Sequence, residues 1–400
     1  MKILLITQYY WPEYAKATDI AETLKTLGND VTVLTGLPNY PIGKIYKGYK
    51  RGKNRKQIRN GVIIIRAKLF ERKNNLISRF LNYYSFSFFA TRKIKSLDSD
   101  FDVVIAIEES PIMLVKPAIK YAKKHKINLL MYEMDLWPES LLAGGIKKGS
   151  LIYKHFLKVS SNIYSKCSKI LVSTFEHIDY IHNLPKCSLI DIGYLPQYAE
   201  ESFEKSRLQT IDNGVIDLMF AGNIGRAQSV DTIINAAEIL KNNPKYLFHI
   251  VGAGSGLKKI KSLTEKKELK NIIFYGNRPF SEMEKLYTIA DIMLVTLENK
   301  PYANLTIPGK VQSYLAFGKP VLGAINGSTY SLINDNKIGV AVESGDYNGL
   351  ALAIKELTKD DLNNYGKNAR DYYFKNMAKS VFFKKLTDEL ISLKKDIKGE

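Results

Sequence analysis

The chain has 400 residues, of which 45% are hydrophobic and 25% charged, a balance that excludes a disordered or collagen-like chain and, at this length, predicts two domains. Two cysteines exclude a disulfide framework, and neither a secretory signal pattern nor an apolar run of the ~20 residues that span a bilayer is visible, so we expect a cytoplasmic protein. The net charge is +19, and residues 44–95 hold sixteen Lys and Arg against one acid, Glu71, which indicates an anionic membrane, nucleic acid or polyphosphate partner.

Apolar, β-branched runs alternate with helical patterns along residues 1–195. We expect strands at Ile3–Ile6, Val31–Leu34, Val62–Ala67, Val103–Ile107, Asn128–Tyr132, Ile170–Val172 and Ser188–Ile190. Helices are expected between most of them, at Thr18–Leu27, Leu76–Lys95, Ile112–Lys124 and Leu151–Ser165. The alternation predicts an α/β domain with a parallel sheet covered on both faces.

Residues 196–214 are polar and interrupt this rhythm, so we interpret them as a linker. The strands then resume at Ile216–Phe220, Leu247–Val251, Ile272–Tyr275, Ile292–Thr296 and Pro320–Leu322. The helices expected among and after them are Ser229–Leu240, Pro279–Tyr287, Gly309–Phe317 and Leu350–Leu357. Residues 215–375 form the second predicted domain, and the helical tail after Asn376 (residues 376–400) is expected to pack back on the first. Two such sheets predict an interdomain cleft that the carboxyl ends of both sets of strands face.

The segment Gly222–Arg226 lies between a predicted strand and a predicted helix. Gly222 and Gly225 let the backbone approach a ligand, and a helix N-terminus offers N–H groups to a phosphate. The guanidinium of Arg226 adds a charge that suits the same group. An ordinary strand–turn–helix connection with an exposed arginine is the structural alternative.

Two further turns belong to the same predicted site. Gly252 opens a glycine-rich turn after the next strand, but Leu257 stands where a dinucleotide fingerprint requires glycine, so plain turn chemistry is equally consistent. Lys310 lies in the first turn of a helix that starts after Pro308, where a cation opposes the helix dipole unless an anion is bound. A solvated surface lysine is the alternative.

In the first domain, Glu133–Glu139 follows a buried strand and places three carboxylates and a tryptophan at its carboxyl end. Asp135 and Glu139 are candidates for orienting an acceptor or binding sugar hydroxyls, and a structural role such as helix capping is the alternative. No Asp, Glu, His or Cys cluster has the spacing of metal ligands, so we expect no metal.

The predicted helix Leu76–Lys95 is rich in aromatic residues and flanked by cations. Ile77, Phe80, Leu81, Tyr84 and Phe88 share one helical face, with Ser78, Asn82 and Ser85 opposite. A basic amphipathic helix of this kind favours a membrane interface. The membrane contacts that we predict are Arg72, Lys73, Arg79, Phe80, Tyr84 and Phe88. A helix packed on the sheet with a basic rim is the alternative.

Five segments together resemble glycosyltransferase family 4, which has the GT-B fold, and in particular a subgroup that builds O-antigen, capsule and colanic-acid repeat units. They are Gln8–Glu13, Val31–Pro41, Asp135–Ser140, Gly222–Gln228 and Ile307–Ala316. The resemblance covers nearly the whole chain. It implies a retaining enzyme that needs no cofactor and takes its sugar, N-acetylated or deoxy, from a UDP-sugar. The acceptor is then a polyprenyl-diphosphate-linked saccharide at the inner face of the cell membrane.

The resemblance also implies residue roles. Arg226 and Lys310 would bind the donor phosphates and act with Asp135 in catalysis. Gly222, Asn223, Gly225, Gly252 and Ser313 complete the donor site, and Tyr10, Trp11, Asp135 and Glu139 the acceptor site. Leu305 and Ser313 replace a pair of glutamates common in the family, and no lysine follows Arg226 before Lys241.

Two alternatives use the same features. A nucleotide-sugar 2-epimerase would need carboxylates and histidines together, and the sequence shows no histidine beside residues 133–139. A non-catalytic membrane- or polyanion-binding protein would explain the basic stretch but not Gly222–Arg226 or Lys310. We expect no nucleic-acid partner, because no recognised binding module is visible.

Overall fold

The computed structural model describes residues 1–73, 75–98, 100–206 and 214–394. The chain divides into two compact units, Met1–Leu195 with Phe383–Glu400 and Pro196–Phe382. The predicted first boundary at 195 coincides with this division. The predicted return of the chain at 376 lies seven residues before Phe383, where the structure places it.

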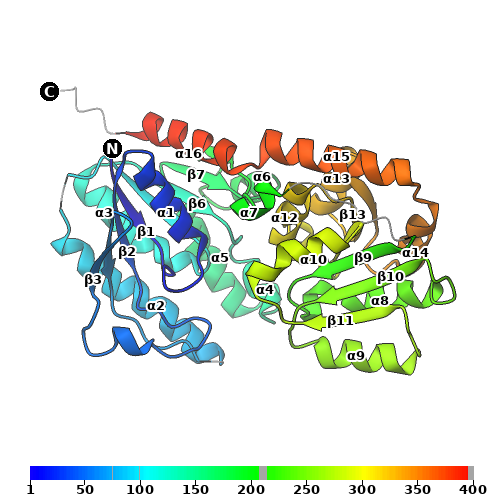
Figure 1. Ribbon diagram of the computed structural model, residues 1–400. Helices are drawn as coiled ribbons and strands as arrows, with labels where there is room; N and C mark the ends of the chain where they lie inside the picture. Colours follow the sequence, from blue (N-terminus) through cyan, green and yellow to red (C-terminus); the bar gives the residue numbers. More distant parts are fainter. Residues whose placement is uncertain (74, 99, 207–213, 395–400) are drawn as a thin grey trace. The chain divides into compact units, whose positions relative to one another are not determined.

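The first unit is built on an eight-stranded sheet with the order β3-β4-β2-β1-β5-β6-β7-β8 (Figure 1). All neighbours are parallel except β3 and β4. The strands are β1 Lys2–Ile6, β2 Asp30–Thr35, β3 Lys56–Arg59, β4 Val62–Arg66, β5 Val103–Glu108, β6 Leu129–Glu133, β7 Lys169–Val172 and β8 Ile192–Tyr194. Its helices are α1 Lys16–Thr26, α2 Leu76–Lys93, α3 Val115–His125, α4 Ser140–Ala143, α5 Leu151–Tyr164 and α6 His177–His182.

Two elements of this sheet differ from the prediction. The last strand is Ile192–Tyr194 and not Ser188–Ile190, because Cys187 and Ile190 close a turn through an N–H···O=C bond (3.2 Å). The strand β3 was not predicted. An antiparallel strand at the edge of a sheet does not need the apolar run that marks a central strand, and the sequence of β3 is largely polar. For this reason no strand signal was visible in the sequence here.

The second unit has a six-stranded parallel sheet with the order β11-β10-β9-β12-β13-β14. The strands are β9 Ile216–Ala221, β10 Tyr246–Val251, β11 Ile272–Gly276, β12 Ile292–Thr296, β13 Val321–Ala324 and β14 Gly339–Val342. Its helices are α7 Glu201–Lys205, α8 Val230–Ile239, α9 Leu257–Lys266, α10 Met283–Ile289, α11 Pro301–Asn304, α12 Gly309–Phe317, α13 Ser328–Asp335, α14 Tyr347–Glu356 and α15 Lys359–Asn376. The last helix, α16 Lys379–Leu393, carries the chain from this unit to the first.

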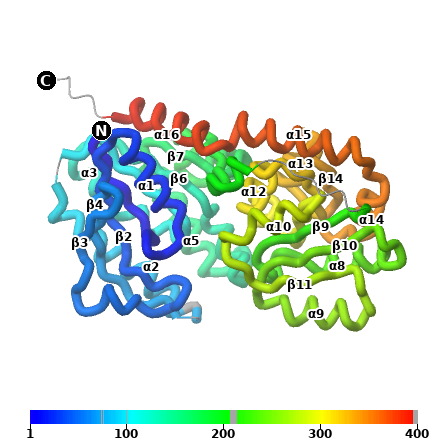
Figure 2. The backbone as a smooth tube through the Cα atoms, in the orientation of Figure 1, coloured from blue at the N-terminus to red at the C-terminus, as the bar shows by residue number. Residues whose placement is uncertain are grey.

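Alternate residues of this sheet enter two separate cores, as the two-residue period of a strand requires. Leu218 and Phe220 pack with α8, α9 and α14, whereas Met219 and Ala221 pack with α10, α12 and α13. Figure 2 shows β9, β10 and β11 side by side with α8 and α9 on one side of them. The strand order reverses between β9 and β12. In parallel sheets, ligands bind where the order reverses, at the edge formed by the carboxyl ends of the strands.

The segment predicted as a linker is partly helical. Glu201–Lys205 forms α7, and Phe203 is buried in the second unit with its ring stacked on Tyr287 (5.0 Å between centroids). The prediction was wrong here because one aromatic residue anchors a polar sequence. Residues 207–213 of the predicted linker and 395–400 of the predicted tail lie outside the described residues.

Candidate active site

A cavity of about 400 Å³ opens at the carboxyl edge of the second sheet. The loops that follow β9, β10 and β11 line it, together with residues of α7, α10 and α12. Four of the predicted donor residues are among the lining residues: Gly222, Asn223, Gly252 and Ser313. The structure therefore gathers most of the predicted donor site around one concave surface.

Glycine allows two loops of this cavity to touch. The Gly222 N–H donates to Val251 O, and the Ile224 N–H to Ala253 O, each at 2.9 Å. Gly252 has φ +136°, and a Cβ built there would lie 1.8 Å from Gly222 O. No other residue fits this position, so the glycine-rich turn after β10 is required for the shape of the cavity.

Lys310 places a cation beside Gly222. Its Nζ lies 3.7 Å from the centroid of the Phe220 ring, and a Cβ on Gly222 would be 2.9 Å from it. Within the described part of the chain the buried Nζ has no hydrogen-bond partner. Burial lowers the pKa of Lys310 to about 7. A buried, unpartnered ammonium next to the partly exposed backbone of Gly222 is suited to an anionic ligand.

Gly225 and Arg226 are placed differently from the prediction. Gly225 N–H already donates to Gln228 Oε1 (3.1 Å), and residues Arg226–Gln228 form a 3-10 turn. Helix α8 begins only at Val230, so the predicted phosphate contact of Gly225 N–H at a helix N-terminus was wrong. Arg226 has an exposed side chain close enough to Tyr302 for its charge to lower the pKa of that hydroxyl, although burial raises it overall to about 12.

The sequence analysis missed other residues of the cavity. Asn277 and Arg278 follow β11 as Gly222 follows β9, and both line the cavity. The Arg278 side chain donates from Nε to Tyr275 O (3.0 Å). Their position directly after a predicted parallel strand was the available signal, because the carboxyl ends of such strands share one edge.

Asp135 lies at the carboxyl edge of the first sheet, two residues after the end of β6, and its side chain is exposed. Reduced solvation among the packed strand ends raises the pKa of Asp135 to about 6, the negative charge of Glu133 adds to this, and His177 opposes it. The carboxyl group is therefore placed to contact a ligand and to exchange a proton near neutral pH.

A buried histidine lies beside these acids, contrary to the prediction. His177 Nδ1 is 2.8 Å from Glu133 Oε2, and Glu133 pairs in register with Glu108 of β5. The sequence hides the contact because 44 residues separate its partners. The exposed fraction of each of these three residues, Glu108, Glu133 and His177, is at most 1%. A substrate cannot reach them, so the histidine gives no support to an epimerase.

Two predicted acceptor residues are internal. Glu139 is buried and accepts hydrogen bonds from Tyr153 (2.6 Å) and Tyr180 (2.8 Å). Tyr10 is fully buried. Neither side chain can contact an acceptor in this structure. Both predictions were wrong because the two residues pack inside the unit, where tyrosine hydroxyl groups bind Oε1 of Glu139.

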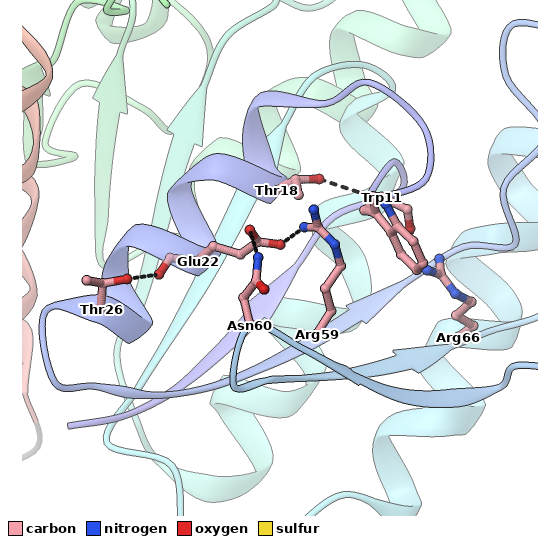
Figure 3. Close-up of polar contacts among 7 residues, drawn as sticks. All are labelled: Trp11, Thr18, Glu22, Thr26, Arg59, Asn60 and Arg66. Carbon is pink, nitrogen blue, oxygen red and sulfur yellow. Dashed lines mark hydrogen bonds and ion pairs between the residues drawn. The ribbon is translucent and has the colours of Figure 1, made fainter. Parts of the chain in front are cut away.

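Trp11 of the same unit is half-buried, and Figure 3 shows the polar side chains around it. Its N–H donates to Thr18 Oγ1 (2.9 Å), and its carbonyl accepts from Arg66. The Arg59 guanidinium lies 5.0 Å from the indole and pairs with Glu22. The half-buried ring can still contribute an edge to an acceptor site.

The buried side of helix α2 includes polar side chains, together with Phe86 and Ala90. Asn82 and Ser85 are buried, whereas Ile77, Leu81 and Phe88 are 75%, 51% and 52% exposed. Asn82 is drawn inward because it accepts from Gln8 Nε2 (2.6 Å) and donates to Phe70 O. An apolar stripe therefore faces outward, and Tyr84 is part of it.

Cations surround this apolar stripe, defined as Ile77, Leu81, Tyr84 and Phe88. Arg92 lies 4.6 Å from the Phe88 ring and Lys116 lies 5.5 Å from the Tyr84 ring. Lys73 is exposed and Arg79 is half-exposed near the start of the helix.

Two residues of the predicted membrane set lie elsewhere. Phe80 is half-buried and stacks on Phe156 of α5 (5.3 Å). Arg72 is enclosed by tyrosine rings. Among the described helices, none is both long and apolar enough to cross a membrane.

Comparison with known proteins identifies the second unit. Residues 201–372, which include every predicted donor residue, match the family described as Glycosyl transferases group 1. A probable glycosyltransferase of Pseudomonas aeruginosa, WbjE, is 27% identical over 78% of this chain and 80% of its own length. A putative colanic acid biosynthesis glycosyl transferase of Escherichia coli, WcaI, is 25% identical over 80% of this chain and 82% of its own.

Solved structures share the whole fold. Sucrose-phosphate synthase of Thermosynechococcus elongatus and Anabaena HepE in complex with UDP each superpose with a TM-score of 0.72 at 13% identity. The match covers 98% of this chain in both cases, and 99% and 100% of those chains. The glycosyltransferase WaaG gives a TM-score of 0.67 at 15% identity, over 98% and 99%. These likenesses confirm the predicted GT-B fold.

Fold and family together define the class of this protein as a glycosyltransferase. Its second unit matches the family of group 1 glycosyl transferases, and the predicted resemblance to polysaccharide glycosyltransferases is confirmed by a relative named for colanic acid biosynthesis.

Proposed function

We propose that this protein is a retaining glycosyltransferase of surface-polysaccharide assembly. It moves an N-acetylated or deoxy sugar from a UDP-sugar to a saccharide linked to polyprenyl diphosphate. The relatives whose names refer to a glycosyltransferase and to colanic acid biosynthesis support the pathway class. A structural neighbour solved with UDP supports the donor.

The unpartnered Nζ of Lys310 beside the glycine-lined cavity carries the donor assignment. A diphosphate bound against Gly222 would restore the charge of this ammonium and satisfy its hydrogen bonds. Arg226 and Arg278 can approach the same anion from the exposed side, since neither is buried. Ser313 and Asn223 line the cavity and are available to the ribose or the sugar.

We propose front-face transfer without a metal or other cofactor. The bond from the sugar C1 to the diphosphate oxygen breaks as the acceptor oxygen bonds to C1, and the acceptor proton passes to the leaving diphosphate. Lys310 and Arg226 stabilise the negative charge that develops on that leaving group. Asp135 orients the acceptor hydroxyl. Nuclear magnetic resonance of the product tests this directly, since an inverted anomeric centre would contradict it.

The apolar stripe of α2 provides the membrane contact. A stripe of exposed apolar side chains bordered by Arg79, Arg92 and Lys116 matches an anionic bilayer interface, where apolar rings enter and cations meet headgroups. We therefore propose a peripheral position on the inner face of the cell membrane. The concentration of basic residues in 44–95 supports the same partner.

Calorimetry with UDP, GDP and NAD tests the donor assignment. We expect UDP alone to bind, and Arg226→Ala and Lys310→Met each to weaken it at least tenfold. Lys245→Met is the matched control, because Lys245 is exposed and lies before β10, at the opposite edge of the same sheet. Failure of well-folded wild-type protein to bind either UDP or GDP would remove the donor site from this cavity.

A further inference from the structure

Arg72 occupies a cradle of tyrosines at the carboxyl edge of the first sheet. Its Nη1 donates to the Tyr9 hydroxyl (3.0 Å), and its guanidinium lies 5.0 Å from the Tyr40 ring and 5.6 Å from the Tyr83 ring. These residues come from the loops after β1, β2 and β4 and from α2. Strands β1, β2 and β4 are mutually parallel, so their carboxyl ends share one edge.

A buried polar network fixes the cradle. Asn39 Oδ1 accepts from the Arg72 N–H and from Asn82 Nδ2, each at 3.3 Å. The backbone N–H groups of Asn39 and Tyr40 donate to Glu13 Oε1 at 2.7 and 2.6 Å. The Arg72 side chain is therefore held by three loops in one position and is not a mobile surface cation.

The charge of Arg72 is left without a carboxylate. No ion pair within the described ranges includes Arg72, and only its Nη1 has a protein acceptor there. Its Nε and Nη2 hydrogens remain for a ligand. Tyr9 is buried, and its hydroxyl accepts from Arg72 and so orients the guanidinium. The planar fork of the guanidinium matches the oxygen atoms of a phosphate.

We propose that Arg72, Tyr9, Tyr40 and Tyr83 form the subsite that binds the phosphate of the acceptor, the group through which its first sugar is attached. This inference rests on the proposed function, because it assigns the acceptor substrate its anionic contact. Tyr40 is 46% exposed and forms the open wall of the subsite. The aromatic rings stabilise the guanidinium by cation–π contact and leave its edge for the ligand.

Asp135 belongs to the same region of the first unit. The Tyr83 ring lies 5.6 Å from the Arg72 guanidinium and edge-on to Trp137 (6.5 Å between centroids), two residues after Asp135. Arg72 would hold the phosphate, and Asp135 would meet a hydroxyl of the attached sugar. An acceptor anchored at its phosphate presents that hydroxyl in a fixed position, which favours reaction.

Binding of farnesyl diphosphate, a soluble prenyl diphosphate, tests the subsite. Calorimetry is performed with saturating UDP, so that the cavity of the second unit is occupied. We expect Arg72→Gln to weaken binding at least tenfold. Arg72→Lys should weaken it as well, because an ammonium lacks the planar fork, and Tyr40→Ala should weaken it about threefold to tenfold. Lys120→Gln removes the same charge from an exposed site on α3 and should bind as wild type does.

The affinity for UDP is measured in parallel for each variant and should not change, because the cavity lies in the second unit. Hydrogen exchange in peptides of β1 and β2 shows separately that the first unit of each variant is folded. Wild-type affinity for farnesyl diphosphate in Arg72→Gln would overturn the subsite even if UDP binds normally. Loss of binding only to phosphatidylglycerol vesicles, with farnesyl diphosphate unaffected, would make Arg72 a headgroup contact and would also overturn it. Failure of UDP binding in the wild type would instead count against the proposed donor.

Discussion

Lys310 couples donor binding to protons. In the folded protein burial lowers its pKa to about 7, whereas a diphosphate favours the charged form. We expect UDP binding at pH 8 to take up a proton, so that the affinity falls by up to tenfold per pH unit above 7. Calorimetry in buffers of different ionisation enthalpy measures this uptake. Lys310→Met is the control and should bind UDP weakly without the pH dependence attributable to the ammonium.

The same group affects folding with a defined sign. Its pKa in the unfolded chain is near the ordinary value of 10.5, so between pH 7 and 10.5 the unfolded state binds more protons than the folded state. The contribution of Lys310 to the free energy of unfolding therefore rises with pH across this window. An unchanged difference in stability between wild type and Lys310→Met from pH 7 to 10 would contradict this.

Gly252 supports the donor cavity through its missing side chain. A Cβ at this position would meet Gly222 O at 1.8 Å, and the backbone has φ +136°. We expect Gly252→Ala to destabilise the second unit by about 1–3 kcal/mol and to weaken UDP binding more than tenfold, because the loops after β9 and β10 must separate. Gly309→Ala is the matched control. No atom lies within 4 Å of its added methyl group, and we expect UDP affinity to be unchanged.

At the scale of elements, helix α2 should bind membranes through its outer stripe. An apolar side chain that becomes fully buried in the membrane interface contributes roughly 1.5–3 kcal/mol to the free energy of binding, and the substitution of Ile77 and Phe88 by serine removes this contribution. We expect the double variant Ile77→Ser, Phe88→Ser to bind phosphatidylglycerol vesicles at least tenfold more weakly in sedimentation. Its melting temperature should be unchanged, since both residues are exposed. Leu189→Ser, at a residue that is 96% exposed elsewhere in the unit, should bind as wild type does.

This helix shows what periodicity leaves undecided. The 3.6-residue pattern predicted where α2 begins and which side chains share a face. It did not indicate which face is buried, because that depends on Gln8 and Phe70, the partners of Asn82 from other parts of the chain. Asn82 looked like a solvent-facing residue in the sequence and is a fixed point of the core.

The glycine-lined cavity was more predictable from sequence than the surroundings of the carboxylates, for a physical reason. Glycines after parallel strands act through local backbone geometry, so the sequence alone could place Gly222 and Gly252 at one edge of the sheet. Whether a carboxylate can contact a ligand depends on the hydrogen-bond partners that the fold places beside it. The sequence does not show that the hydroxyl groups of Tyr153 and Tyr180 both donate to the carboxylate of Glu139. The surroundings of Arg72 were hidden in the same way, because its tyrosine neighbours come from separate loops.

At the scale of the whole molecule, the charges and the proposed functions are divided between two units. The first holds the basic residues of 44–95, the stripe of α2 and the cradle around Arg72, all features suited to an anionic, lipid-linked acceptor. The second holds the glycine-lined cavity and the match to group 1 transferases. Lipid contact and nucleotide contact are therefore expected to respond to different substitutions.

The C-terminal helix ties the end of the chain to the first unit. Glu389 of α16 pairs with Lys169 of β7 (2.7 Å), Asn128 Nδ2 donates to Leu393 O (2.9 Å), and Leu390 is fully buried. We expect Leu390→Ala to destabilise the first unit by about 2–5 kcal/mol, the usual cost of removing a buried leucine side chain. Hydrogen exchange should then increase in peptides of β6 and β7.

Peptides around Gly222 and the affinity for UDP should remain as in the wild type, because they belong to the second unit. The adjacent Ile391→Ala is the matched control: Ile391 is 59% exposed, so its truncation should change neither unit. Equal increases of exchange in both units after Leu390→Ala would show that the C-terminal helix stabilises the chain as a single cooperative structure, contrary to a role confined to the first unit.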